Sequence, residues 1–280
     1  MRLQAFGSTG RQVPVLGQGT WNMERDDRAR ALAALERGIE LGMTHIDTAE
    51  LYGYGRVEQM IAPVVQRHRE TLFLVSKVMP SNASRAGTIA ACEKSLKLLG
   101  TDRLDCYLLH WPGSIPLVDT IAGLEALKEQ GKILAWGVSN FDVADLERAE
   151  RIAGPGKIAC NQVLYHLQER AIEAAVLPWC DSHGVALVGY SPFGSGSFPG
   201  ESDPGGRELA RLAKARGCTA RQLALAFLTR RPNLFAIPKA SSAGHVEDNA
   251  GADALTLSDD EIKAIDKAFP AKARRGLPML

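Results

Sequence analysis

Four side chains that could move a proton follow successive predicted strands of this sequence. Asp47 ends one apolar segment with Tyr52 close behind it, Lys77 ends the next segment, and His110 ends the one after that. A tyrosine, with an ordinary pKa of about 10, is a weak acid at neutral pH unless a nearby cation stabilises its phenolate. Lys77 is a candidate for that cation, and Asp47 for the counter-charge that keeps a shielded lysine protonated. With His110 oriented toward a carbonyl, the set suits protonation of an oxygen while hydride reaches the carbon.

Each of these residues also has an ordinary structural role when it is taken singly. Asp47 could cap the following helix, and Lys77 could be a solvent-exposed charge at a strand end. His110 could be a packing histidine and Tyr52 an aromatic side chain at a rim. Their joint appearance favours a shared chemical role, because independent structural causes would not select this combination.

Strand and helix patterns alternate along nearly the whole chain, and these elements must position the four side chains. Such alternation is typical of a parallel α/β fold. Eight short apolar segments are predicted to be strands: 15–16, 44–46, 72–75, 104–109, 133–138, 158–163, 185–189 and 234–237. Eight strand and helix units in about 250 residues match a closed (β/α)8 TIM barrel better than an open doubly wound sheet. The carboxyl ends of barrel strands meet on one face, so the four polar side chains are expected there.

Both ends of the chain carry elements outside these eight units. Residues 1–13 contain Gly7-Ser8-Thr9-Gly10, which predicts a short N-terminal hairpin turn covering the barrel floor. Extra C-terminal helices are expected, the last of them beginning at a capping box of Ser258 and Glu261. No change of composition marks a linker, so residues 1–280 are predicted to form one domain.

Composition excludes several classes of function. The 33 basic and 32 acidic residues give a formal charge of +1, so no overall field attracts nucleic acid or an anionic membrane. The five cysteines are widely spaced without a C-x-x-C pair, which indicates reduced thiols with packing roles. No apolar signal core and no run of about 18 apolar residues is present, so a cytoplasmic protein is expected. The six histidines lack ligand spacing, which argues against a metal-dependent barrel hydrolase.

Motifs in order along nearly the whole chain resemble those of the aldo-keto reductases. They are GMTHIDTAELYG at 42–53, VSK at 75–77, LLHWP at 108–112, GVSNF at 137–141, NQV at 161–163 and IPK at 237–239. Within this family the chain is most similar to short bacterial aldehyde and methylglyoxal-type reductases. The resemblance implies an NAD(P)H-dependent carbonyl reductase on a (β/α)8 barrel.

The resemblance also assigns roles to individual residues. Asp47, Tyr52, Lys77 and His110 match the catalytic tetrad of the family, with Tyr52 as the proton donor. Tyr54 is excluded because it lies two residues beyond the family's spacing from Asp47. The substrate pocket would be bordered by Trp21, Tyr52 and Trp111.

A cofactor site is predicted from the loops rather than from a Rossmann motif, because Gly17-Gln18-Gly19 lacks the Rossmann spacing. A barrel holds phosphate with the loops after its seventh and eighth strands and an adjacent helix N-terminus. By resemblance, the nicotinamide would contact Tyr190, Ser139, Asn140 and Gln162, and the cofactor channel would be lined by Gly19, Thr20 and Trp21. The pyrophosphate would contact Ser191, Phe193 and Gly194. The 2′-phosphate would contact Lys239 and Ser241, and the adenine would contact Asp248 and Asn249. Turn formation and helix capping are the alternative roles of the serines and asparagines.

The chain departs from the family pattern in ways that affect specificity. His245 stands where many members carry an arginine facing the 2′-phosphate, and a neutral imidazole offers less charge and no bidentate fork. Lys239 and Ser241 still favour NADPH, with use of NADH left open. The sequence GYGR at 53–56 replaces the usual acidic or amide residue, and segment 112–119 and the tail after Phe269 are short. An open pocket for small aldehydes, dicarbonyls or aromatic aldehydes is expected.

A second class of function fits the same fold. Some proteins of this fold are redox-sensing, cofactor-binding regulatory subunits of membrane channels. The intact set of four polar residues favours turnover over that role. A monomer is expected, and the sequence leaves the natural substrate and the direction of the reaction open.

Overall fold

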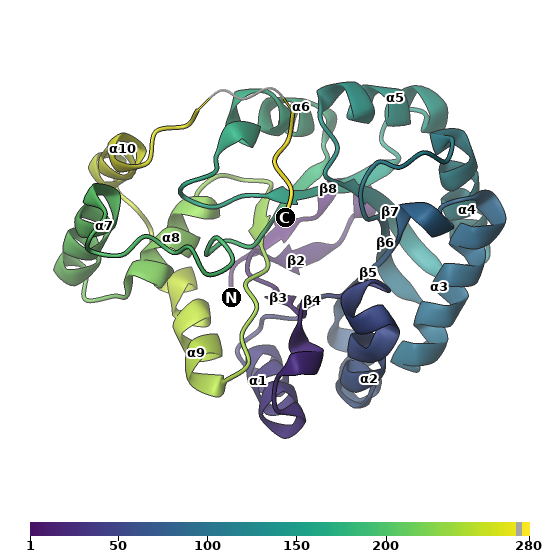
Figure 1. Cartoon of the computed structure of the whole chain (residues 1–280), viewed down its shortest axis with the longest axis horizontal. Coiled ribbons are helices and arrows are strands. Elements are labelled where there is room, and N and C mark those ends of the chain that lie inside the picture. Colours follow the sequence, from purple (N-terminus) through teal and green to yellow (C-terminus); the bar gives the residue numbers. More distant parts are fainter. Residues whose placement is uncertain (273–275) are drawn as a thin grey trace.

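The structure is a computed structural model that describes residues 1–272 and 276–280. Its central element is an eight-stranded parallel sheet in which strands follow one another in chain order. The strands are β3 (Gln18–Gly19), β4 (His45–Asp47), β5 (Phe73–Val78), β6 (Leu104–Leu109), β7 (Ile133–Ser139), β8 (Ile158–Leu164), β9 (Ala186–Tyr190) and β10 (Leu234–Ala236). Figure 1 shows these strands surrounded by helices.

Backbone contacts between the first and last strands close the sheet into the predicted barrel. Leu16 bridges Ala236 and Gly19 bridges Lys239, both in parallel. The Gly17 N–H donates to the Ala236 carbonyl oxygen at 2.8 Å. The (β/α)8 fold expected from the sequence is therefore confirmed.

The first barrel strand extends later in the chain than predicted. The predicted segment 15–16 contributes one parallel bridge, from Leu16 to Ala236, whereas the ladder with β4 is formed by Gln18 and Gly19. A Cβ atom on Gly17 would lie 2.7 Å from the His45 carbonyl oxygen, and one on Gly19 would lie 2.8 Å from that of Ile237. Neighbouring backbones approach so closely that glycine is required, although glycine argues against a strand in the sequence.

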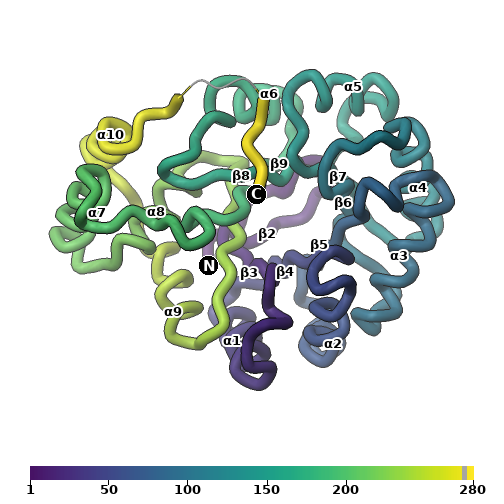
Figure 2. Tube along the Cα trace, in the orientation of Figure 1, coloured from purple at the N-terminus to yellow at the C-terminus, as the bar shows by residue number. Residues whose placement is uncertain are grey.

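Helices follow the strands around the outside of the barrel. They are α1 (Arg28–Glu40), α2 (Arg56–His68), α3 (Arg85–Leu99), α4 (Leu117–Glu129), α5 (Val143–Ala153), α6 (Val176–His183), α7 (Pro204–Ala215), α8 (Ala220–Leu228), α9 (Ala243–Gly251) and α10 (Asp259–Ala268). Helix α10 begins with the predicted reciprocal capping box of Ser258 and Glu261. Figure 2 shows α7 and α10 together at the outer edge of the molecule.

The predicted N-terminal hairpin is present and covers one end of the barrel. Strands β1 (Leu3–Ala5) and β2 (Gln12–Pro14) pair antiparallel. The connection carries Phe6, whose fully buried ring lies 4.6 Å from that of Phe73 and 5.0 Å from that of Phe235. Phe6 therefore seals the interior at the end opposite the carboxyl ends of the strands.

The five cysteines are free thiols, four of them buried and Cys218 half-buried. In the part of the chain that the structure describes, none of the helices has the length and apolar character needed to cross a membrane.

Candidate active site

A buried ion pair lies at the carboxyl ends of two neighbouring strands. Asp47 ends β4, and Lys77 comes from β5; both side chains are almost completely buried. The Lys77 Nζ atom donates to Asp47 Oδ1 at 2.6 Å and to the Thr48 carbonyl oxygen at 2.9 Å. It also donates to the Tyr52 hydroxyl at 3.3 Å. The ammonium therefore links the carboxylate to the phenol.

The chain conformation after β4 separates Tyr52 from Tyr54. Tyr52 begins a short 3₁₀ turn that ends at Gly55. Gly53 has φ 57° and Gly55 has φ 90°, conformations that glycine adopts without the strain imposed by a Cβ atom. Tyr54 is 78% exposed, whereas Tyr52 contacts Lys77. Of the two tyrosines, the structure brings Tyr52 to the ion pair.

His110 follows β6 and lies beside Tyr52, with ring centroids 5.8 Å apart and planes at 72°. Its Nδ1 atom is buried and has no hydrogen-bond partner among the described residues. Burial, followed by the Lys77 charge, lowers the pKa of His110 to about 2. The imidazole is therefore neutral at physiological pH and presents one N–H donor and one acceptor nitrogen.

The electrostatics of Tyr52 differ in part from the sequence expectation. Burial raises the pKa of Tyr52, and this outweighs the opposing effect of Lys77, while Asp47 raises the pKa further. Burial would lower the pKa of Lys77, but Asp47 and then Tyr52 overcome it and keep that pKa raised. The site thus holds a protonated Tyr52 phenol next to a Lys77 side chain that stays positively charged.

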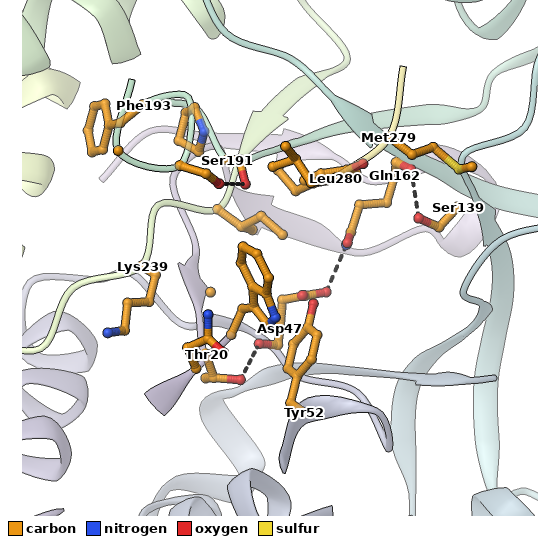
Figure 3. Close-up of a pocket in the computed structure, with 18 of the residues that line it drawn as sticks. Thr20, Asp47, Tyr52, Ser139, Gln162, Ser191, Phe193, Lys239, Met279 and Leu280 are labelled. Atoms are coloured by element: carbon orange, nitrogen blue, oxygen red, sulfur yellow. Dashed lines mark hydrogen bonds between the residues drawn. The ribbon is translucent and has the colours of Figure 1, made fainter. Parts of the chain in front are cut away.

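These residues face a cavity of about 830 Å³, shown in Figure 3. Most of the predicted site residues line it: Gly19, Thr20, Trp21, Asp47, Tyr52, His110, Trp111, Ser139, Asn140, Gln162, Tyr190, Ser191, Phe193, Lys239, His245, Asp248 and Asn249. Its size is in the range of small-molecule and cofactor sites. Lys77 is fully buried and contacts the cavity wall through Tyr52 and Asp47.

Hydrogen bonds join the carboxyl ends of five strands around the cavity. The Gln162 amide, in β8, donates to Asp47 Oδ2 at 2.8 Å, a contact that the sequence did not predict. The Tyr190 hydroxyl donates to Asn140 Oδ1 at 3.0 Å, and the Asn140 amide donates to the His110 carbonyl oxygen at 3.2 Å. These bonds connect the ends of β4, β6, β7, β8 and β9 at one rim.

Ser241 lies in a smaller hollow of about 300 Å³, which Lys239 and His245 also line. Lys239 thus lies at the boundary of the two cavities, and Figure 3 shows it at the opposite side of the view from Met279. Gly194, expected near the cofactor, does not line either cavity; its N–H donates to the Ser191 carbonyl oxygen at 2.8 Å. Gly194 shapes the loop after β9.

Pro192, Ser195 and Gly196, in the loop expected to meet the pyrophosphate, also line the large cavity. Other lining residues were missed in the sequence: Asn22, Leu51, Phe198, Arg221, Ile237, Met279 and Leu280. The Arg221 guanidinium lies 4.9 Å from the ring centroid of Phe198 and 5.8 Å from that of Phe193. Its helix, α8, shows only a core-packing pattern in the sequence, which gives no sign of this position.

Among residues 1–272 and 276–280, no group of three or more histidine, cysteine, aspartate or glutamate side chains is arranged to hold a metal ion.

Known proteins are similar to this chain in sequence and in fold. The profile of the Aldo/keto reductase family matches residues 15–269. Methylglyoxal reductase YeaE of Escherichia coli is 43% identical over 271 residues, which cover 96% of this chain and 95% of that protein. Glyoxal reductase of Bacillus subtilis is 32% identical over 263 residues, covering 92% and 89% of the two proteins. A crystal structure of an aldo/keto reductase from Klebsiella pneumoniae in complex with NADP and acetate has a TM-score of 0.93 and 40% identity, with 100% of both chains covered.

Proposed function

The chain belongs to the aldo/keto reductase family, as its motifs predicted, and we propose that it is an NADPH-dependent carbonyl reductase with Tyr52 as the proton donor. The observation that carries this proposal is the contact between the Tyr52 phenol and the buried Lys77–Asp47 pair. Substrates are small aldehydes, ketones and dicarbonyls, a range supported by the similar methylglyoxal and glyoxal reductases. The products are the corresponding alcohols.

The residues around the cavity fit a phosphorylated nicotinamide dinucleotide. The large cavity extends from Tyr52 to Lys239, and Tyr190 and Asn140 line it between them. Lys239 and Ser241 donate to a single carboxylate oxygen of Asp26, so their donors converge on one anionic oxygen. In this proposal they hold the 2′-phosphate, while Ser139, Asn140, Gln162 and Tyr190 hold the nicotinamide end. A reduced nicotinamide supplies a hydride when it is bound.

The protein's own part is to deliver a proton to the carbonyl oxygen. The Tyr52 hydroxyl gives up its proton, and the Lys77 ammonium at 3.3 Å stabilises the tyrosinate that remains. Asp47 holds Lys77 in place, and Gln162 in turn holds the second oxygen of Asp47. The neutral His110 ring donates an N–H to the same carbonyl oxygen and orients it. Because the ion pair is buried, these charges act with little screening by water.

Replacement of Tyr52 tests this proposal. We expect Tyr52→Phe to lower kcat by at least about a hundredfold, because general acid catalysis contributes roughly 10² to 10⁴ in rate. The dissociation constant of NADPH, measured by protein fluorescence, is expected to stay within about twofold, a shift below 0.5 kcal/mol. Tyr54→Phe is the matched control and is expected to keep full activity, because Tyr54 is exposed.

An active Tyr52→Phe enzyme would refute the assignment of the proton donor. A wild-type protein that binds NADPH but oxidises none of it with a broad panel of aldehydes would support the redox-sensing regulatory role instead.

A further inference from the structure

The Asp26 carboxylate lies in the smaller hollow and contacts Lys239 and Ser241. It lies at the end of a short 3₁₀ turn, Met23–Arg25, in the connection between β3 and α1. Its Oδ2 atom accepts from Lys239 Nζ at 2.5 Å and from Ser241 Oγ at 2.5 Å. Both donors come from the connection between β10 and α9, on the opposite wall of the hollow. One carboxylate oxygen therefore uses the two groups proposed to hold the 2′-phosphate.

Charged groups of both signs surround this contact. Arg30 and His245 line the same hollow, and α9 begins beside it at Ala243. Asp27 also lines the hollow, where its carboxylate accepts from the Arg30 backbone N–H at the start of α1. A helix amino end carries a partial positive charge. Burial alone would raise the pKa of Asp26, but the hydrogen bonds from Lys239 and Ser241 outweigh it and hold that pKa below its ordinary value. Asp26 is thus ionised at neutral pH.

We propose that Asp26 competes with the 2′-phosphate of NADPH and thereby sets how strongly the protein prefers NADPH over NADH. This inference rests on the proposed function and concerns a residue outside the predicted site. For a 2′-phosphate to bind, Lys239 and Ser241 must exchange the Asp26 carboxylate for phosphate oxygens. NADH has a hydroxyl at that position, so it binds without breaking the contacts of Asp26.

Electrostatic repulsion between Asp26 and the 2′-phosphate also weakens NADPH binding relative to NADH binding. A phosphate monoester carries between one and two negative charges at neutral pH. The displaced Asp26 carboxylate stays tethered nearby and repels it. The Asp26 and Lys239 side chains are 28% and 32% exposed, so water screens part of this repulsion. Asp26 therefore weakens NADPH binding selectively without abolishing it.

The test compares cofactor binding by Asp26→Asn and a matched control. We expect Asp26→Asn to tighten NADPH binding by about tenfold and to change NADH binding by less than about twofold. Dissociation constants are measured by fluorescence titration and calorimetry, so that no turnover is needed. Glu247→Gln is the control: it removes one negative charge from α9, where Glu247 pairs with Arg37 and contacts neither Lys239 nor Ser241. Its effect on either cofactor is expected to be below about twofold.

Lys239→Met provides the opposing variant. It should weaken NADPH binding by at least about tenfold and leave NADH binding within about twofold, because only the phosphate uses this cation. Adenosine 2′-phosphate is titrated as a probe of the smaller hollow alone. In every variant its dissociation constant should change in the same direction as that of NADPH.

Three results would overturn the inference. They are an equal change for both cofactors in Asp26→Asn, a weaker affinity for NADPH in that variant, and a Glu247→Gln effect as large as that of Asp26→Asn. Failure of the wild-type protein to bind either cofactor would instead refute the proposed function, which separates the two outcomes.

Discussion

His110 carries no charge in the folded chain, because burial and then the Lys77 ammonium lower its pKa to about 2. An ordinary histidine titrates near pH 6.5. We therefore expect kcat/KM for aldehyde reduction to show no inflection near pH 6.5 that arises from His110. The rate should instead decline only at alkaline pH, where Tyr52 loses its proton, because burial raises the pKa of Tyr52.

The measurement is a pH series of kcat/KM for the wild type and for His110→Gln. The variant is expected to be slower at every pH while keeping the same curve shape, because glutamine retains an N–H donor but does not titrate. An inflection near pH 6.5 that disappears in His110→Gln would contradict a neutral imidazole.

At the scale of single elements, helix α2 carries a buried carboxyl group, Glu58, against strand β5. The Glu58 side chain accepts from the Ser76 hydroxyl at 2.7 Å and is fully buried. Burial raises the pKa of Glu58 above its ordinary value of 4.5, against the opposing hydrogen bond from Ser76. A raised carboxyl pKa means that the unfolded chain releases this proton more readily than the folded chain. The contribution of Glu58 to stability is therefore fully present below pH 4.5 and is lost as the pH rises through the folded pKa.

We expect Glu58→Gln to stabilise the protein at pH 8 by roughly 1 to 2 kcal/mol, because a buried amide avoids the cost of a buried charge. The gain should shrink as the pH is lowered toward 5. Urea unfolding at several pH values measures the difference in the free energy of unfolding between the variant and the wild type. Glu40→Gln, at an exposed position, is the control and is expected to change the free energy of unfolding by less than about 0.5 kcal/mol. A stability difference that does not depend on pH would contradict this account.

The sequence predicts elements well where one local pattern decides the structure. Strand β6 is predicted at its observed bounds because a run that is apolar apart from Asp105 marks a strand buried on both faces. Asp47, Lys77 and His110 can be predicted to meet because strand ends converge in a barrel. Strand β3 was misplaced because its glycines are required by neighbouring backbones, which a local pattern does not contain.

The positions of Asp26 and Arg221 could not be predicted for a related reason. Asp26 lies in a connection whose sequence indicates only a turn, and its partners are more than 200 residues away. Arg221 lies on a helix whose apolar pattern indicates packing alone. Long-range contacts of this kind depend on how the barrel closes, so they become visible only in three dimensions.

At the scale of the whole molecule, the two ends of the barrel have different roles. The hairpin and Phe6 seal one end, and the polar cluster lies at the other. We expect Phe6→Ala to lower the free energy of unfolding by roughly 3 to 5 kcal/mol, the usual cost of removing a buried phenylalanine. NADPH affinity should stay within about twofold under conditions where the variant is folded.

Urea unfolding and cofactor titration of the same samples test this separation. Leu3→Ala, on the exposed side of the hairpin, serves as the control and should cost less than about 0.5 kcal/mol. A loss of NADPH affinity in folded Phe6→Ala would show that the two ends are coupled.

The cysteines have a consequence for an enzyme proposed to act on reactive dicarbonyls, because nucleophilic sulfur attacks the carbonyl carbons of such compounds. The reactive form of cysteine is the thiolate. Burial raises the pKa of Cys92 to about 12 and also raises the pKa of Cys180 and of Cys218. The hydrogen bond with Cys106, together with burial, raises the pKa of Cys160. These four thiols are therefore held in the protonated, less reactive form, so we expect them to react slowly with the dicarbonyls that the protein is proposed to reduce.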